Sequence, residues 1–281
     1  MPIRAMTVFG TRPEAIKMAP VVQALAADDR FEGICCVTAQ HRDMLDQVLG
    51  LFELTPDHDL DLMRPGQTLH KLTARIIAGL GDVFEADRPD VVLVHGDTTT
   101  TLAATLAAFY ARIPVGHVEA GLRTGDLSAP FPEEANRVLA DRICAYHFPP
   151  TERSAQNLRD EALPEHGIQI TGNTVIDALL WVRERVSGRP FDADTYGTAT
   201  EALSDGASRV VLITGHRRRA SVVALSASVR PSRILLRAIP TSTSCTPSTS
   251  TRACRSPSTG TCRIARTSTC CRPSTTRPLC A

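Results

Sequence analysis

Short apolar runs alternate with helix-like segments along most of the chain. The runs AMTVFG (5–10), GICCVTA (33–39), DVVLVHG (90–96) and PVGHVEAG (114–121) are largely apolar, as strands buried on both faces are. Segments with apolar residues at helical spacing separate them. This alternation predicts an α/β fold with a doubly wound parallel sheet covered on both sides. We expect helices at 13–27, near 44–51, and at 68–85, 98–112, 132–143 and 174–186.

The pattern changes in the second half of the chain. A polar link at 187–208 leads to the apolar run RVVLITG (209–215), which is predicted to open a second sheet. We therefore assign residues 1–178 to an N-terminal Rossmann-like domain. Residues 179–218 are assigned to a linker and the start of a second Rossmann-like domain.

The composition changes abruptly after Arg218. Residues 219–281 contain ten arginines and six of the nine cysteines, but no Asp, Glu, Lys, His or aromatic residue. An ordinary soluble segment is about a quarter charged, with both signs mixed. The tail has no helical or strand period, no C-x-x-C pair and no histidine to complete a zinc site. We expect residues 219–281 to be poorly ordered.

The first 218 residues resemble a soluble, cytoplasmic protein. They carry 21 basic and 30 acidic residues, a net charge of −9. The N-terminus has no signal-peptide pattern, and no apolar run approaches the length of a membrane span. Cys35, Cys36 and Cys144 lie in apolar surroundings, so we expect reduced core cysteines. The basic excess lies in the tail and lacks aromatic residues, so no nucleic-acid or membrane partner is expected.

Polar residues cluster where the predicted strands end. In doubly wound sheets, ligands bind beyond the carboxyl ends of the strands. The segments in these positions are Gly10-Thr11-Arg12-Pro13-Glu14, Gln40-His41-Arg42-Asp43, His95-Gly96-Asp97-Thr98, His117-Val118-Glu119-Ala120-Gly121, Gly172-Asn173-Thr174 and Gly215-His216-Arg217-Arg218.

Each candidate in these segments also has a structural explanation. The turn at Gly10, with Arg12 and Lys17 nearby, could bind an anion at a helix N-terminus or could simply carry surface charge. Asp97 precedes the run TTTTLAATL, where it would serve as a helix N-cap. His216 beside two arginines suits a diphosphate, or a solvated basic loop. These alternatives stay open at this point.

Further acidic candidates follow along the chain. Glu133 and Glu134 begin a predicted helix, where acids suit the helix dipole, and Glu133 could pair with Arg137 one turn later. Glu119 lies at a strand end close to Arg123, a setting in which a carboxylate of shifted pKa is built. Carboxylates and arginines at one sheet edge indicate proton transfer next to a bound phosphate ester.

Seven ordered motifs resemble those of one enzyme family. They are FGTRPEAIKMAP, TAQHRDMLDQVL, PGQTL, VLVHGDTTTTLAATLAAFYARIPVGHVEAGLRT, PFPEEANRVLADRI, TGNTVIDAL and LITGHRR. Together they cover Ile3 to Arg218 and resemble the bacterial non-hydrolysing UDP-N-acetylglucosamine 2-epimerases. The HGDTTTT run matches the hydrolysing relatives less well.

This resemblance implies a glycosyltransferase-B-like architecture, with nucleotide-sugar bound between two Rossmann-like halves. It implies interconversion of UDP-GlcNAc and UDP-ManNAc through elimination and re-addition of UDP, by a homodimer, without a metal or nicotinamide cofactor. By position, the resemblance makes Asp97, Glu119 and Glu133 the candidate acid/base carboxylates. The candidates for substrate and diphosphate contacts are Arg12, Lys17, Arg137 and His216. Which carboxylate serves which sugar face stays open.

The tail departs from the family pattern. The family continues after GHRR with a run like ESFG, then YPVHLNP, then a uridine-diphosphate site, and none of these occurs here. Read one base out of phase, the codons of 219–222 allow ESFG, and those of 240–252 allow PDVHFVYPVHLNP. We interpret residues 219–281 as a frameshifted translation of the second domain. The alternative is a natural Ser/Thr/Arg-rich extension.

A chain with this tail lacks most of the second half of the cleft. We expect it to be inactive, because nucleotide binding and cleft closure need both halves. Two other functions are left open by the residues. The chain could act as a binding or regulatory fragment that pairs with an intact epimerase, or the fold could serve a related nucleotide-sugar glycosyltransferase.

Overall fold

The computed structural model describes residues 1–38, 42–62, 64 and 66–187, with the backbone alone at 42–44. Met1–Ser187 form one compact unit. The predicted second sheet, the tail, His216 and the residues Gln40 and His41 lie outside the described residues.

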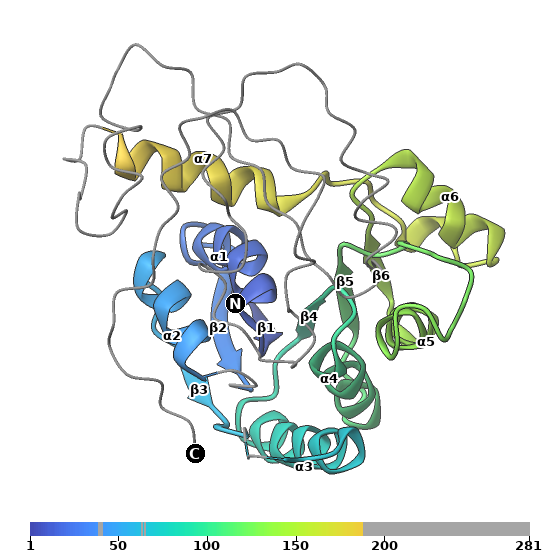
Figure 1. Cartoon of the computed structure of the whole chain (residues 1–281). Helices are drawn as coiled ribbons and strands as arrows, with labels where there is room; N and C mark the ends of the chain where they lie inside the picture. Colours follow the sequence, from blue (N-terminus) through green and yellow to red (C-terminus); the bar gives the residue numbers. More distant parts are fainter. Residues whose placement is uncertain (39–41, 63, 65, 188–281) are drawn as a thin grey trace, which may run out of the picture. The chain divides into compact units, whose positions relative to one another are not determined.

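One parallel sheet of six strands organises this unit (Figure 1). The strand order is β3-β2-β1-β4-β5-β6, which is the order of the Rossmann fold. The predicted α/β class with a doubly wound parallel sheet is therefore confirmed. The strands are β1 (Ile3–Phe9), β2 (Phe31–Val37), β3 (His58–Asp59), β4 (Val91–His95), β5 (Val115–Val118) and β6 (Tyr146–Phe148).

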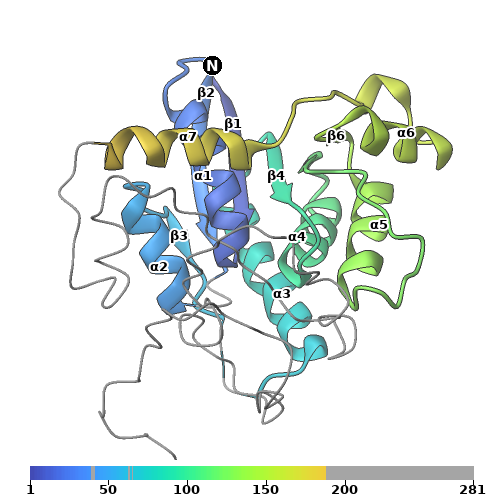
Figure 2. The same cartoon turned by 45° about the horizontal axis from the view of Figure 1, so that its top comes forward.

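Helices cover both faces of the sheet, as Figures 1 and 2 show. The core on one face is built mainly from α3 and α4, and the core on the other from α1 and α2, with α7 packed against α1. The helices are α1 (Arg12–Ala26), α2 (Arg42–Leu51), α3 (Leu69–Asp87), α4 (Thr99–Tyr110), α5 (Glu133–Ile143), α6 (Glu152–Asp160) and α7 (Thr174–Val186), and a 3₁₀ turn spans Glu165–Gly167.

The apolar runs are continuous because β1, β2, β4 and β5 each supply both cores. Met6 and Val8 of β1 point into the core under α3 and α4, whereas Phe9 packs into the core under α1 and α2. All three side chains are fully buried. A strand buried on both faces needs apolar residues at successive positions, so its pattern does not alternate.

Three parts of the topology differ from the prediction. Strand β3 was not predicted, since two residues are too few to carry a pattern. Helix α6 was not predicted either, because its sequence is mostly polar and it buries only Ser154, Ala155 and Leu158. The strand expected before the segment Gly172-Asn173-Thr174 is a single β-bridge from Ile168 to His147.

Helix α7 is anchored by aromatic contacts at its C-terminal half. The Trp181 ring stacks on Phe52 with 4.8 Å between centroids, and the Arg185 guanidinium lies 4.0 Å from the Trp181 ring centre. Arg185 also pairs with Glu53 at 2.8 Å. These contacts hold the N-terminal end of α7, which carries Asn173, over the sheet edge.

The predicted core cysteines are buried and free. Burial raises the pKa of the Cys35 thiol to about 12, so this thiol stays protonated. Across the described residues, no helix combines the length and apolarity needed to cross a membrane. In the same part of the chain, no group of three or more His, Cys, Asp or Glu side chains is arranged to hold a metal ion.

Candidate active site

The candidate site lies where β4 and β5 end side by side. The chain leaves β4 through Gly96 and Asp97, and leaves β5 through Glu119 and Gly121. Glu119 has a φ of +63°, in the left-handed region that non-glycine residues rarely adopt. Such local strain is concentrated at functional positions, because the surrounding structure must hold it in place.

Glu119 is the centre of a compact charged cluster. Both oxygens of its carboxylate accept hydrogen bonds from Lys17 Nζ, at 2.6 and 2.7 Å. Asn173 Nδ2 donates to Glu119 Oε1 at 2.8 Å from the start of α7, and His95 Nε2 lies 3.5 Å from Oε2. The predicted residues Lys17 and Glu119 are therefore brought together, from α1 and β5.

This cluster keeps Glu119 ionised. Burial raises the pKa of the Glu119 carboxyl, but the charge and hydrogen bonds of Lys17 and the hydrogen bond from Asn173 more than offset that effect, so the pKa lies below its ordinary value. Burial also lowers the pKa of His95 to about 3, so this imidazole is neutral at pH 7. The charge that balances Glu119 is therefore that of Lys17.

Asp97 forms a second centre on the neighbouring loop. Its Oδ2 pairs with Arg137 Nη2 at 2.9 Å, and Asn136 Nδ2 donates to its backbone carbonyl at 2.9 Å. The predicted alternative for Asp97, an N-cap of α4, is wrong. Thr98 is the N-cap, and its hydroxyl accepts from the Thr101 amide, so the Asp97 carboxylate is left to face Arg137.

The environment of Asp97 opposes its ionisation. Burial raises the pKa of this carboxyl, Arg137 and Lys17 lower it, and the nearby Glu133 and Glu119 carboxylates raise it again. The net pKa lies above the ordinary value. Because the Glu119 and Glu133 carboxylates both act on Asp97, the three predicted carboxylates lie close to one another at this edge of the sheet.

The two adjacent acids of α5 have different surroundings. Glu134 is 1% exposed, and its Oε1 accepts from the backbone amides of Thr124 and Gly125 at 2.7 and 3.0 Å. Glu134 therefore holds the loop after β5. Arg137 pairs through its side chain with Asp97 and Glu134, and its contact with Glu133 is to the backbone carbonyl. The spacing of Glu133 and Arg137 predicted an ion pair between their side chains. The structure instead has Arg137 Nε donating to the backbone carbonyl of Glu133, at 3.4 Å.

The turn after β1 differs from the expectation. The amides of Gly10 and Thr11 donate to Glu14 Oε2, at 2.9 and 2.7 Å, so they bind a side chain of the same turn and are not free to bind a ligand anion. Glu14 is 2% exposed and also accepts from Thr98 Oγ1 at 2.5 Å, which ties α1 to the start of α4. Arg12 is exposed on the first turn of α1.

Gly10 is required by close approach rather than by its backbone angles. A Cβ at this position would lie 2.0 Å from Thr38 Oγ1 and 2.6 Å from Thr100 Oγ1. These two hydroxyls are hydrogen bonded to each other at 3.0 Å. The loop after β1 is therefore packed tightly against the ends of β2 and α4.

Three polar residues of this edge were included in the segments at the predicted strand ends but were not assigned a role from the sequence. His95 and Asn173 contact Glu119, and Glu14 organises the Gly10 turn. His95 and Asn173 could have been assigned a role, because both directly follow or end an apolar run. The role of Glu14 depends on Thr98, 84 residues later, and no local pattern carries that information.

A parallel sheet in this strand order, with two acidic loops side by side beyond its carboxyl edge, defines a Rossmann-like α/β protein with a candidate site at that edge. A family model described as UDP-N-acetylglucosamine 2-epimerase matches residues 23–231. The chain belongs to this family, and the resemblance inferred from its motifs is confirmed.

Individual relatives agree with the family match. The UDP-N-acetylglucosamine 2-epimerase of Yersinia pestis is 63% identical over 216 residues, which are 77% of this chain and 57% of the relative. That of Escherichia coli K12 is 60% identical over 217 residues. The chain therefore matches a little over half the length of these curated relatives.

Two solved structures show the same fold. The UDP-GlcNAc 2-epimerase of Neisseria meningitidis, bound to UDP-GlcNAc, is 52% identical with a TM-score of 0.71, over 77% of this chain and 58% of that chain. The Methanocaldococcus jannaschii enzyme, in complex with UDP-GlcNAc and UDP, is 35% identical with a TM-score of 0.63, over 66% and 51%.

Proposed function

We propose that this protein derives from a UDP-GlcNAc 2-epimerase of the non-hydrolysing type and that its first unit supplies the acid/base half of the site. The single observation that carries the proposal is the pair of neighbouring carboxylates, Asp97 and Glu119, with pKa values shifted in opposite directions. Pairs of acids whose environments separate their pKa values are typical of acid/base catalysis.

The proposed reaction proceeds by elimination and re-addition. One base removes the proton from C2 of the sugar, the bond from C1 to the diphosphate oxygen breaks, and UDP leaves with the electron pair. UDP then adds back to the 2-acetamidoglucal at C1, and C2 takes a proton on the opposite face. Asp97, Glu119 and Glu133 are the groups proposed to carry these protons.

Cationic side chains would stabilise the departing diphosphate. Lys17 and Arg137 already pair with Glu119 and Asp97, so a bound diphosphate would compete for them. Arg12 is exposed near the same edge and is free to approach a phosphate. His216 completes the proposed set by the resemblance and lies outside the described residues.

We also propose that the 281-residue chain does not convert UDP-GlcNAc to UDP-ManNAc. Its residues 219–281 contain none of the family's second-domain motifs, which supports a frameshift after Arg218. In the domain division that we propose, residues 1–178 form the first domain, and the second begins within 179–218 as half of a glycosyltransferase-B-like architecture.

The partners and the compartment are part of the same proposal. Three buried, free cysteines support a reducing cytoplasm. A homodimer is proposed from the resemblance, and the rings of Phe109 and Tyr110, 58% and 67% exposed at the end of α4, support an apolar contact surface. The acidic first 218 residues support the absence of a nucleic-acid partner.

One experiment tests the proposal. The chain as written and a restored-frame chain, translated with the frame corrected after Arg218, are each incubated with UDP-GlcNAc in D₂O and followed by proton NMR. We expect the restored-frame chain to form UDP-ManNAc with deuterium at C2 and the chain as written to form none. A folded restored-frame chain without turnover would overturn the epimerase, and turnover by the chain as written would overturn its inactivity.

A further inference from the structure

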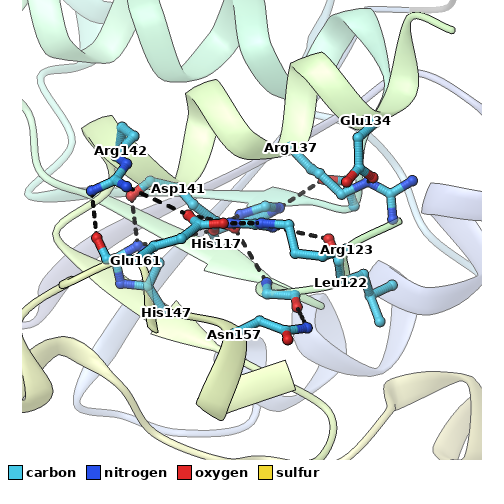
Figure 3. A network of polar contacts seen from close by, with 12 residues as sticks. His117, Leu122, Arg123, Glu134, Arg137, Asp141, Arg142, His147, Asn157 and Glu161 are labelled. Carbon is cyan, nitrogen blue, oxygen red and sulfur yellow. Dashed lines mark hydrogen bonds and ion pairs between the residues drawn. The ribbon is translucent and has the colours of Figure 1, made fainter. Parts of the chain in front are cut away.

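His117 belongs to a network of polar contacts that also includes Arg123, Asp141 and Glu161 (Figure 3). It lies on β5 and is completely buried. Its Nδ1 is 2.6 Å from Asp141 Oδ1 on α5, and its Nε2 is 2.7 Å from the backbone carbonyl of Gly96 after β4. Both ring nitrogens are therefore within hydrogen-bond distance of an oxygen.

Both of these oxygens are acceptors. A backbone carbonyl carries no proton. Asp141 Oδ2 accepts from the Arg123 guanidinium at 2.8 Å and from the Gly121 amide at 3.2 Å, and pairing with this permanent cation keeps the group a carboxylate at neutral pH. Each ring nitrogen of His117 must then donate a proton, and an imidazole that donates from both nitrogens is an imidazolium.

The charged groups around His117 are paired. Asp141 Oδ2 also accepts from Arg123 Nη2 at 2.8 Å, and Arg123 Nε in turn donates to Glu161 Oε1 at 2.6 Å. Two cations and two anions thus alternate along one chain of contacts, and the exposed Arg142 pairs with Glu161 at the outer end of the chain, at 3.9 Å. Such pairing is what makes a buried ion pair tolerable in a low-dielectric interior.

The other charged or titratable groups that face His117 do not compete for its proton. They are His95 on β4, His147 on β6 and Arg123 after β5. Burial lowers the pKa of both His95 and His147, so both are neutral at pH 7. His147 Nε2 donates to the Asp141 backbone carbonyl at 2.8 Å, and its Nδ1 has no hydrogen-bond partner among the described residues.

The same pair of residues touches both catalytic loops. His117 holds the Gly96 carbonyl, which directly precedes Asp97, and Asp141 Oδ2 accepts from the amide of Gly121, two residues after Glu119. Gly121 has a φ of +78°, and a Cβ there would lie 2.2 Å from the carbonyl oxygen of Ser154. The turn after Glu119 is therefore fixed from both sides.

We propose that the His117–Asp141 pair is a positioning element in which a permanently protonated His117 sets the separation of the Asp97 and Glu119 loops. Neither residue touches the reacting atoms. The catalytic consequence rests on the proposed function, whereas the protonation state and the loop positions do not. The pair explains how two loops from different strands keep two carboxylates at one place without a direct bond between them.

The first test needs no substitution. The full chain is labelled with ¹⁵N-histidine, and the ring nitrogen shifts are followed from about pH 6 to about pH 9. We expect both His117 nitrogens to remain protonated throughout, and His147 to be a neutral Nε2–H tautomer at pH 7 and above, as an internal control. A neutral His117 tautomer at pH 7 would overturn the proposal.

The second test compares two buried histidines that both contact Asp141. In His117→Gln, the link to Gly96 is weakened and the charge is lost, so we expect the carboxyl ¹³C titration of Asp97 to move toward its ordinary range as its loop opens. In His147→Gln, which does not touch Gly96, we expect the titrations of Asp97 and Glu119 to stay in place. Unchanged titrations in a folded His117→Gln protein would overturn the proposal.

Both readouts are independent of turnover. If His117→Gln fails to fold, the ¹⁵N experiment on the unsubstituted chain still decides between protonated and neutral His117. If the restored-frame chain shows no epimerase activity, both NMR results still stand or fall by themselves. Failure of the positioning element is thereby distinguishable from failure of the proposed function.

Discussion

Glu119 and Asp97 leave neighbouring strands at the same sheet edge, yet their surroundings act in opposite directions. Glu119 is held by Lys17 through both carboxylate oxygens, and its pKa is lowered. Asp97 has one arginine partner and two acidic neighbours, and its pKa is raised. Position at the edge therefore selects candidate residues, whereas the partners of each residue decide which proton chemistry it can perform.

The largest expected effect is the loss of kcat when either Asp97 or Glu119 is replaced. In the restored-frame chain, Asp97→Asn and Glu119→Gln should each lower kcat by roughly 10²–10⁴-fold, the usual contribution of a positioned acid or base. Glu152→Gln, an exposed acid on α6, serves as the control. Rates of UDP-GlcNAc conversion measure this, and a kcat close to the parent value in either variant would remove that residue from the acid/base set.

Loss of the Asp141 carboxylate, which pairs with both His117 and Arg123, should have the next largest effect. Asp141→Ala leaves His117 and Arg123 buried without their carboxylate, so we expect the free energy of unfolding to fall by about 3–5 kcal/mol. Glu165→Ala removes a partner from an exposed arginine and should leave the unfolding midpoint unchanged. Urea unfolding compares the two. Equal midpoints would show that the buried network does not hold the fold.

Removing the Lys17 ammonium should bring the pKa of Glu119 closer to that of Asp97. In Lys17→Met the carboxylate of Glu119 loses the cation that keeps it ionised, so its pKa should rise, and the protein should lose about 1–3 kcal/mol because a largely buried charge loses its partner. Lys71→Met, at an exposed position on α3, is the matched control. Carboxyl ¹³C titration measures the pKa, and an unchanged Glu119 would show that other groups compensate its charge.

The smallest effects expected are opposite changes in stability. Because the pKa of Glu119 is lowered by folding, its ionisation stabilises the fold above its ordinary pKa of 4.5, and that contribution is lost as the pH falls through the lowered value. Because the pKa of Asp97 is raised above 3.8, its ionisation lowers the stability as the pH rises from 3.8 to the raised value, and the full cost is present above that value. At pH 7, Glu119→Gln should destabilise the protein and Asp97→Asn should stabilise it. Unfolding at pH 7 and at about pH 3 checks this. Changes of the same sign at pH 7 would contradict it.

Much of the fold could be predicted because strands buried on both faces produce continuous apolar runs. The runs around Met6 and Val94 were identified for this reason, and both residues are fully buried. The pattern failed where an element is short or polar. Strand β3 has two residues, and α6 presents only Ser154, Ala155 and Leu158 to the interior, so neither leaves a periodic signal.

The site could be located but not fully assigned from the sequence. Asp97 and Glu119 were found because each follows an apolar run. The different surroundings of Glu133 and Glu134 arise from one residue of helical rotation, about 100°, which spacing alone cannot orient. The pairing of His117 with Asp141 joins a strand to a helix 24 residues later and depends on tertiary packing.

The most direct test of this account is a carboxyl ¹³C titration of the chain as written, with Asp97 and Glu119 assigned by Asp97→Asn and Glu119→Gln. The account predicts that Glu119 titrates below its ordinary range and Asp97 above its own, in the same sample. If the order is reversed, or if both carboxyls titrate as in an exposed peptide, then the two loops do not form the acid/base pair described for this sheet edge.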